Sequence, residues 1–125
     1  MQTVEVLSEP HLASVLVSAL ASSTKRPGVV KKLKPVTLVR PQVVLDAAHI
    51  ARYNAICGFK AEQGVPLIYP QMLTFPLVMS FFGSEACPWP ALGTVHLANR
   101  IEQKKSLRAG DTVRVEMQTG ELFAH

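Results

Sequence analysis

The chain has 125 residues, a formal net charge of +4, and 48% hydrophobic against 18% charged residues. This length suits one folded domain, 1–125, and this composition excludes an intrinsically disordered chain. The longest apolar stretch, from about Phe75 to Phe82, is far shorter than the roughly 20 residues of a membrane-spanning helix. Glu5 and Glu9 stand where a secretory signal would carry positive charge, so no signal is expected.

The first predicted element is an amphipathic helix. Ser8-Glu9-Pro10 is typical of a helix start, because serine can cap and proline is tolerated in the first turn. Apolar residues then recur at helical spacing until about Ser22 or Ser23, at Leu12, Val15, Leu16, Ala19 and Leu20. A loop marked by Pro27-Gly28 follows, so residues 8–34 form a helix and a basic loop ahead of a core at 35–125.

Six of the thirteen cationic residues gather in and just after this loop, at Lys25, Arg26, Lys31, Lys32, Lys34 and Arg40. Such a cluster attracts anions, which makes Lys31, Lys32 and Lys34 candidate phosphate-binding residues. An ordinary solvated loop is the alternative. Aromatic residues that would stack on single-stranded nucleic acid are scarce nearby, so nucleic acid is not an expected partner. The short apolar stretch gives no reason to expect a membrane as a partner either.

A strand and a second helix are predicted in the next stretch. Residues 36–45 are rich in β-branched types, and Pro41 places this strand at or near a sheet edge, with a bulge as an option. Asp46 is a good N-cap for the helix, and Gly58 is a suitable stop. Ile50, Tyr53 and Cys57 share one side of it, which favours core packing of Cys57 over a nucleophilic role.

The most apolar segment is predicted to be a central helix. After a loop at 59–66 and a short extended piece at 67–69, Pro70 opens a stretch that is apolar nearly all round from Met72 to Phe82. Such a segment is buried on most sides. Pro76 would kink this helix or fix its first turn.

Strands are predicted to follow in the last third. Residues 92–102 alternate between apolar and polar types, a turn is expected at 107–111, and residues 113–117 alternate again. Thr119-Gly120 resembles a hairpin turn, with a further strand beginning at Leu122 and Phe123. Helices and grouped strands indicate an α+β domain. The sheet is expected to be incomplete at its C-terminal edge, which a partner should cover.

Four segments, in this order, carry a resemblance to a known family: Tyr53-Asn-Ala-Ile-Cys-Gly-Phe59, Tyr69-Pro-Gln-Met-Leu73, Leu92-Gly-Thr-Val-His-Leu-Ala-Asn99 and Leu107-Arg-Ala-Gly-Asp111. From about Leu33 onward the chain resembles MaoC-like acyl-thioester dehydratases and (R)-specific enoyl-CoA hydratases, in particular the N-terminal half of members with two hotdog domains. The resemblance implies a hotdog fold, in which a curved antiparallel sheet wraps a central helix.

The resemblance also implies a chemistry. Family members bind fatty acyl thioesters of coenzyme A or acyl carrier protein, and add water to an enoyl group or remove it from a 3-hydroxyacyl group. They need no metal or redox cofactor. A second hotdog domain or subunit, in a homodimer or pseudo-dimer, is an expected partner.

The family's acid–base motif departs from its pattern in this chain. The motif runs Tyr, three residues, Ser or Thr, then Gly-Asp-x-Asn-Pro-x-His. Tyr53 and Gly58 match, but Cys57 replaces the hydroxyl residue, and Phe59 and Gly64 occupy the Asp and His positions. Since neither carries a titratable proton, the resemblance implies an acyl-binding domain that has lost its catalytic pair.

A second segment of the resemblance concerns substrate binding. Ile68-Tyr-Pro-Gln-Met-Leu73 resembles the family's segment at the start of the central helix, where free N–H groups hold the thioester carbonyl. An ordinary helix start is the alternative. The candidate substrate-binding residues are Tyr69, Gln71, Met72, Phe75 and His96.

Two alternatives to a non-catalytic domain remain open. His96 is a weak catalytic candidate, which could act with Glu102 or Glu62 as a relocated pair in an active lyase, although a structural histidine is favoured. A module that binds nucleic acid or anionic lipid through the basic loop is the third hypothesis.

The two cysteines bear on the compartment. Cys57 and Cys87 form no C-x-x-C pair and have no histidine at metal-ligand spacing, so no metal site is predicted. A reduced, cytoplasmic setting is the simplest interpretation, while a disulfide between the two stays open.

Overall fold

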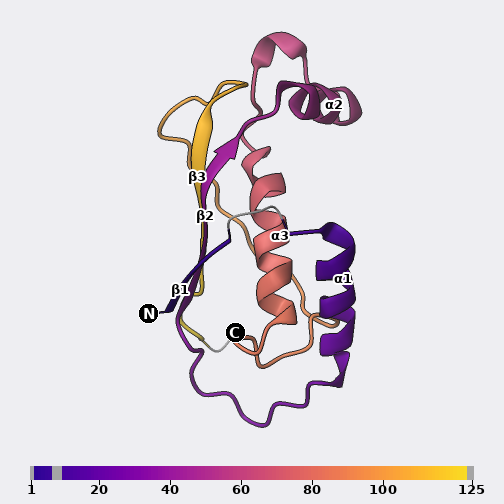
Figure 1. The fold of residues 1–125 in the computed structure, drawn as a ribbon, viewed down its shortest axis with the longest axis vertical. Coiled ribbons are helices and arrows are strands. Elements are labelled where there is room, and N and C mark those ends of the chain that lie inside the picture. The colour runs from indigo at the N-terminus through magenta and orange to yellow at the C-terminus, as the bar shows by residue number, and fades with distance from the viewer. Residues whose placement is uncertain (1, 7–9, 124–125) are drawn as a thin grey trace.

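The computed structural model of the chain describes residues 2–6 and 10–123. In chain order its elements are β1 (Gln2–Glu5), α1 (Leu12–Ala21), the 3-10 turn η1 (Ser22–Thr24), β2 (Val36–Val44), α2 (Ala47–Cys57), the 3-10 turn η2 (Ala61–Gln63), α3 (Pro70–Gly83) and β3 (Thr112–Gln118). Helix α3 lies between a three-stranded sheet and α1, and α2 lies beyond the N-terminal end of α3 (Figure 1). This arrangement confirms the predicted α+β class.

The sheet has the strand order β1-β2-β3, and it is mixed. Strand β3 pairs with β2 in antiparallel orientation, as predicted for the core at 35–125, whereas β1, which precedes that core, pairs with β2 in parallel. No strand was predicted at the N-terminus, although Thr3, Val4, Glu5 and Val6 alternate as in a strand. Among the described residues β2 is the middle strand, next to both edge strands rather than at the edge itself.

The bulge considered for β2 is present. The pairing of β2 with β3 shifts register between Arg40 and Val43. On its other side, β2 pairs with β1 only from Val36 to Val39. Pro41 therefore lies within the bulge and past the last β1 partner, where its missing N–H group breaks no regular ladder bond.

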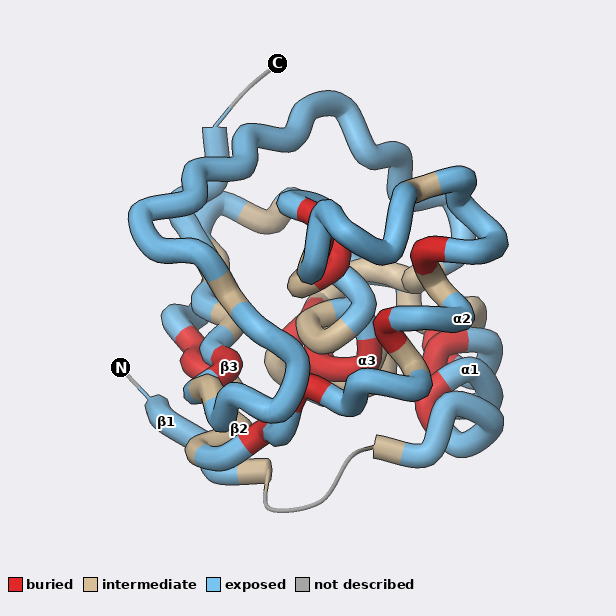
Figure 2. Tube along the Cα trace, turned by 90° about the horizontal axis from the view of Figure 1, so that it is seen from above, coloured by how far each residue is buried: buried red, intermediate tan, exposed pale blue. Residues whose placement is uncertain are grey.

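Two hydrophobic clusters hold the layers together. Leu77 of α3 is fully buried and packs on Val43 of β2 and Val115 of β3. The second cluster consists of Leu45, Ile50 and Tyr69, and it ties α2 and the start of α3 to the end of the sheet. Figure 2 shows the buried positions on α3, on the sheet and on the inward sides of α1 and α2.

The alternation predicted for β3 is confirmed, because Val113, Val115 and Met117 are at least partly buried and their neighbours are exposed. Helix α1 agrees only in part with its predicted apolar face. Val15 and Ala19 are buried, whereas Leu12, Leu16 and Leu20 are 52%, 43% and 58% exposed. Ser8 and Glu9, the expected helix start, lie outside the described residues.

Helix α2 forms as the sequence predicts. Asp46 accepts hydrogen bonds from the backbone N–H groups of Ala48 and His49, at 2.8 and 3.4 Å. Gly58 ends the helix in the left-handed region at φ 76°, which glycine adopts without steric cost.

Three predicted extended segments are not strands in the described structure. Residues 92–102 are coil and exposed, residues 67–69 form the turn that leads into α3, and Leu122 and Phe123 are coil. An alternating segment becomes a strand only when another strand supplies hydrogen-bond partners. The N–H group of Thr119 donates to the carbonyl of Val36 at 3.0 Å, and the hydroxyl of Thr119 accepts from the N–H group of Val36 at 2.9 Å. Residues 119–123 form neither a turn nor a strand, so the expected hairpin is not found among the described residues.

Candidate functional site

The loop that carries the altered acid–base motif lies at the N-terminal end of α3. The ring of Phe59 stacks on Tyr53 with centroids 6.4 Å apart, and Tyr53 packs edge-on against Tyr69 at 5.4 Å. The amide of Asn54 donates a hydrogen bond of 3.2 Å to the carbonyl of Gly64. Since Tyr69 is the residue before α3, Phe59 and Gly64 lie where the resemblance implies.

The backbone of this loop is itself unsuited to a histidine at position 64. Gly64 has φ 71° and ψ −138°, a combination that is essentially confined to glycine. A histidine at this position would be strained even though no atom lies within 4 Å of the site of its Cβ. Position 64 therefore departs from the motif in its backbone conformation as well as in its side chain.

A groove of about 730 Å³ runs between β2, the start of α2 and the first half of α3. We call it the β2-side groove, and its lining includes Leu12, Arg40, His49, Tyr69, Met72 and Phe75. Three of the predicted substrate-binding residues, Tyr69, Met72 and Phe75, thus share one groove. Tyr69 is fully buried, whereas Met72 and Phe75 are 46% and 42% exposed.

The groove contains a histidine–tyrosine pair that sequence reasoning missed. The Nδ1 atom of His49 lies 2.7 Å from the hydroxyl of Tyr69, and the two rings meet edge to face. His49 is partly buried. His49 is the third residue after the N-cap Asp46, and this spacing fixes the side of α2 on which its side chain lies. The position of His49 on the helix could therefore have been read from the sequence.

Arg40 adds a cation to the same groove. It lies at the β2 bulge, and its Nε atom is buried without a hydrogen-bond partner among the residues that the structure describes. The sequence pattern indicates for Arg40 only membership of the basic cluster. A buried donor without an acceptor is unfavourable, so this atom marks a place where an acceptor would be stabilised.

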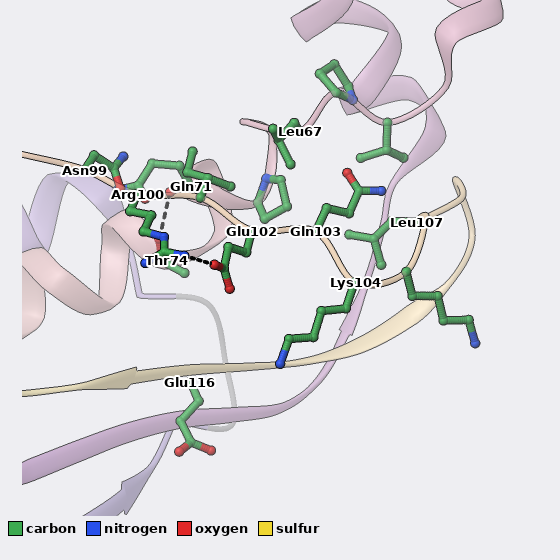
Figure 3. A pocket seen from close by; sticks show the side chains of 15 residues that line it. Leu67, Gln71, Thr74, Asn99, Arg100, Glu102, Gln103, Lys104, Leu107 and Glu116 are labelled. Atoms are coloured by element: carbon green, nitrogen blue, oxygen red, sulfur yellow. Dashed lines mark hydrogen bonds and ion pairs between the residues drawn. The ribbon is translucent and has the colours of Figure 1, made fainter.

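A second groove of about 610 Å³, the β3-side groove, lies on the other side of α3 (Figure 3). Gln71 and Thr74 of α3 line it together with residues 99–105, and an ion pair joins Arg100 to Glu102. The structure therefore separates Gln71 from Tyr69, Met72 and Phe75.

His96 lines neither groove. It is exposed, and its Nε2 atom lies 2.8 Å from the carbonyl of Ala98. Glu102, its suggested partner, pairs with Arg100 instead. The described residues thus show no contact of His96 with Glu102 or with Glu62 that would form a relocated pair.

The backbone N–H groups at the start of α3 already have acceptors. Those of Gln71 and Met72 donate to the carbonyls of Ile68 and Tyr69, at 3.1 and 2.9 Å. A thioester carbonyl would have to share or replace these bonds, and the carbonyl-binding role of the two residues stays a prediction.

The lysines of the basic loop differ in their surroundings. Lys31, Lys32 and Lys34 are exposed, as a solvated loop requires, and their phosphate-binding role stays a prediction. Lys25 is partly buried and donates to the carbonyls of Phe82, Ser84 and Cys87, at 3.1, 2.7 and 2.7 Å. It therefore caps the C-terminal end of α3.

The expected core position of Cys57 is wrong. Both cysteines are free, and Cys57 is exposed whereas Cys87 is buried. Burial raises the pKa of Tyr53 above its ordinary value, and the charge of Cys57 and its hydrogen bond to the phenol act in the same direction.

The chain is similar to a known dehydratase. It is 35% identical over 89 residues to the 3-hydroxyacyl-thioester dehydratase X of Mycobacterium tuberculosis (strain ATCC 25618 / H37Rv). The match covers 71% of this chain and 32% of the relative, so the chain spans about a third of that enzyme's length. No family model matches the chain, and no solved structure matches it.

This match confirms the resemblance to the MaoC-like dehydratase family. Together with a sheet packed on one side of α3, it supports the predicted hotdog fold, here with an open sheet of three described strands. The described residues contain no group of three metal-ligating side chains. None of their helices has the length and hydropathy needed to cross a membrane.

Proposed function

We propose that this chain is an acyl-thioester-binding hotdog domain of a 3-hydroxyacyl-thioester dehydratase, and that it does not supply the acid–base pair of the reaction. One observation carries the proposal: Phe59 and Gly64 occupy the motif positions beside the start of α3, with Gly64 at φ 71°. The similarity to a 3-hydroxyacyl-thioester dehydratase supports the substrate class.

The missing pair has a large expected effect on rate. A positioned general acid or base contributes about a hundredfold to ten-thousandfold. In this proposal a second hotdog domain, on the same polypeptide or in a partner subunit, provides the Asp–His pair. The ligand is a fatty acyl group on coenzyme A or acyl carrier protein, no metal or redox cofactor takes part, and the setting is cytoplasmic, as two free cysteines favour.

Hydration of crotonyl-CoA tests the catalytic half of this proposal. The purified chain is expected to show no loss of the enoyl absorbance beyond that of a heat-denatured sample. Turnover by the pure chain that disappears in His96→Ala would contradict it, because it would establish a relocated catalytic group.

Calorimetric titration tests the binding half. The chain is expected to bind decanoyl-CoA and to bind coenzyme A without an acyl group much more weakly. A chain that binds neither compound would refute the acyl-binding role whatever the result of the hydration assay.

A further inference from the structure

We propose that Arg40 and the His49–Tyr69 pair form the polar end of an acyl-binding site in the β2-side groove. The ligand is a fatty acyl group whose head carries an acceptor oxygen, either a thioester carbonyl or a carboxylate. This inference rests on the proposed function and specifies where the acyl group lies, namely on the β2 side of α3.

Arg40 provides the first argument, because its chemistry allows only one kind of partner. A guanidinium donates hydrogen bonds and accepts none. Its Nε atom is buried and has no partner among residues 2–6 and 10–123. Asp46, the acidic residue that also lines the groove, already accepts from the N–H groups of Ala48 and His49. A ligand oxygen would supply the acceptor that Nε lacks.

The His49–Tyr69 pair provides the second argument. Tyr69 is 1% exposed and its hydroxyl lies 2.7 Å from Nδ1 of His49. Both residues line the same groove as Arg40. Two buried or partly buried polar side chains held by each other, in the same groove as an arginine whose Nε atom is buried, make a preorganised polar end rather than a solvated surface.

Apolar side chains supply the rest of the groove. Leu12, Met72 and Phe75 line it and remain 52%, 46% and 42% exposed. An alkyl chain laid along them would remove apolar surface from water at several positions together. A groove with one polar end and an apolar length fits an acyl group better than a nucleotide or a sugar.

The β3-side groove lacks this combination. Its arginine, Arg100, is already paired with Glu102, and the two side chains are 85% and 55% exposed. An exposed, neutralised ion pair offers little to an acceptor oxygen. Each groove therefore contains one arginine, and the two differ. The Nε atom of Arg40 is buried without a partner among the described residues, whereas Arg100 is exposed and paired with Glu102.

Calorimetric titration of decanoyl-CoA into the 125-residue chain and its variants tests the site. Arg40→Met keeps the aliphatic stem and removes the guanidinium, and it is expected to weaken binding by about tenfold or more, as for loss of a hydrogen bond to a charged group. The matched control Arg100→Met is expected to leave the dissociation constant unchanged. Phe75→Ser, at a 42% exposed position, provides a second groove variant should Arg40→Met fail to fold, and is also expected to weaken binding.

The outcomes separate this inference from the proposed function. Undiminished binding by both groove variants, or equal weakening by Arg100→Met, overturns the β2-side site while the acyl-binding role stands. Equal binding of coenzyme A and decanoyl-CoA overturns the acyl class of ligand. Sodium decanoate that competes with decanoyl-CoA, and does so less well against Arg40→Met, supports recognition of the head oxygen. Absence of any binding by the wild-type chain refutes the proposed function itself.

Discussion

Gly83, the last residue of α3, lies against Ser18 of α1 so closely that a Cβ atom at position 83 would be 2.7 Å from the Cβ of Ser18. Real Cβ atoms do not approach each other to this distance, so a side chain at position 83 would push the two helices apart. Glycine at this place permits the close packing of α1 on α3.

Gly83→Ala is therefore expected to lower the free energy of unfolding by about 1–3 kcal/mol, the usual cost of overpacking. Urea denaturation of the two proteins measures this difference. Gly28→Ala is the control, because nothing lies within 4 Å of a Cβ at position 28 and no loss of stability is expected there. Equal stability of Gly83→Ala and wild type would mean that α1 can shift without cost.

Lys25→Met tests the cap at the same, C-terminal end of α3. The substitution keeps the alkyl stem but leaves the carbonyls of Phe82, Ser84 and Cys87 without their shared ammonium donor. We expect a loss of about 1–3 kcal/mol, measured by thermal and urea unfolding. Lys31→Met, at an exposed position of the same loop, should change stability by less than about 0.5 kcal/mol. A similar loss in both variants would point to net charge rather than capping.

Asp46→Ala removes the side-chain acceptor at the start of α2. Two N–H groups, those of Ala48 and His49, lose their partner, and a loss of about 1 kcal/mol is expected. Glu85→Ala, at an exposed position outside the regular elements, is the control for removal of one negative charge. The cap assignment fails if the two variants unfold at the same urea concentration.

Tyr53 predicts a dependence of stability on alkaline pH. Its pKa is raised in the folded chain, first by burial and then by Cys57. The unfolded chain therefore loses the phenolic proton at lower pH than the folded chain does. The stabilisation is complete below the ordinary tyrosine pKa of about 10 and is lost as pH rises through the raised value.

Unfolding free energies measured from about pH 8 to about pH 11 check this sign. The wild-type chain is expected to lose more stability over this interval than Tyr53→Phe does. Ultraviolet titration of the phenols should give a lower pKa for Tyr53 in Cys57→Ser, since one contribution to the shift is removed. Identical alkaline profiles of wild type and Tyr53→Phe would contradict the prediction.

Local signals in the sequence predicted local structure well. Helix α2 begins after Asp46 and stops at Gly58, because an N-cap and a left-handed glycine act within one turn of the chain. The apolar segment that follows Pro70 forms α3, because proline is well tolerated in the first turn of a helix. The register shift near Pro41 could also be anticipated, since proline cannot donate to a ladder.

Features that depend on distant partners were predicted poorly. Residues 92–102 alternate as a strand would, yet no described strand pairs with them. Cys57 lies two helical turns after the buried Ile50, but α2 extends beyond the core at this end and leaves the thiol exposed.

The candidate site was predicted in the same uneven way. The altered motif placed Phe59 and Gly64 correctly near α3, because a family resemblance carries long-range information. The meeting of Arg40, His49 and Tyr69 depends on how β2, α2 and α3 pack together. No periodicity or spacing within any one of these segments reveals it.

The exposed stretch of chain that returns from the end of α3 to the start of β3 (orange in Figure 1) has a consequence for proteolysis. Trypsin can reach Arg100, Lys104 and Lys105 there, whereas β3 is bound along its length to β2. A single cut would therefore yield two fragments that remain associated and separate only in denaturant. The domain is therefore expected to keep its fold after the backbone is cut in this stretch.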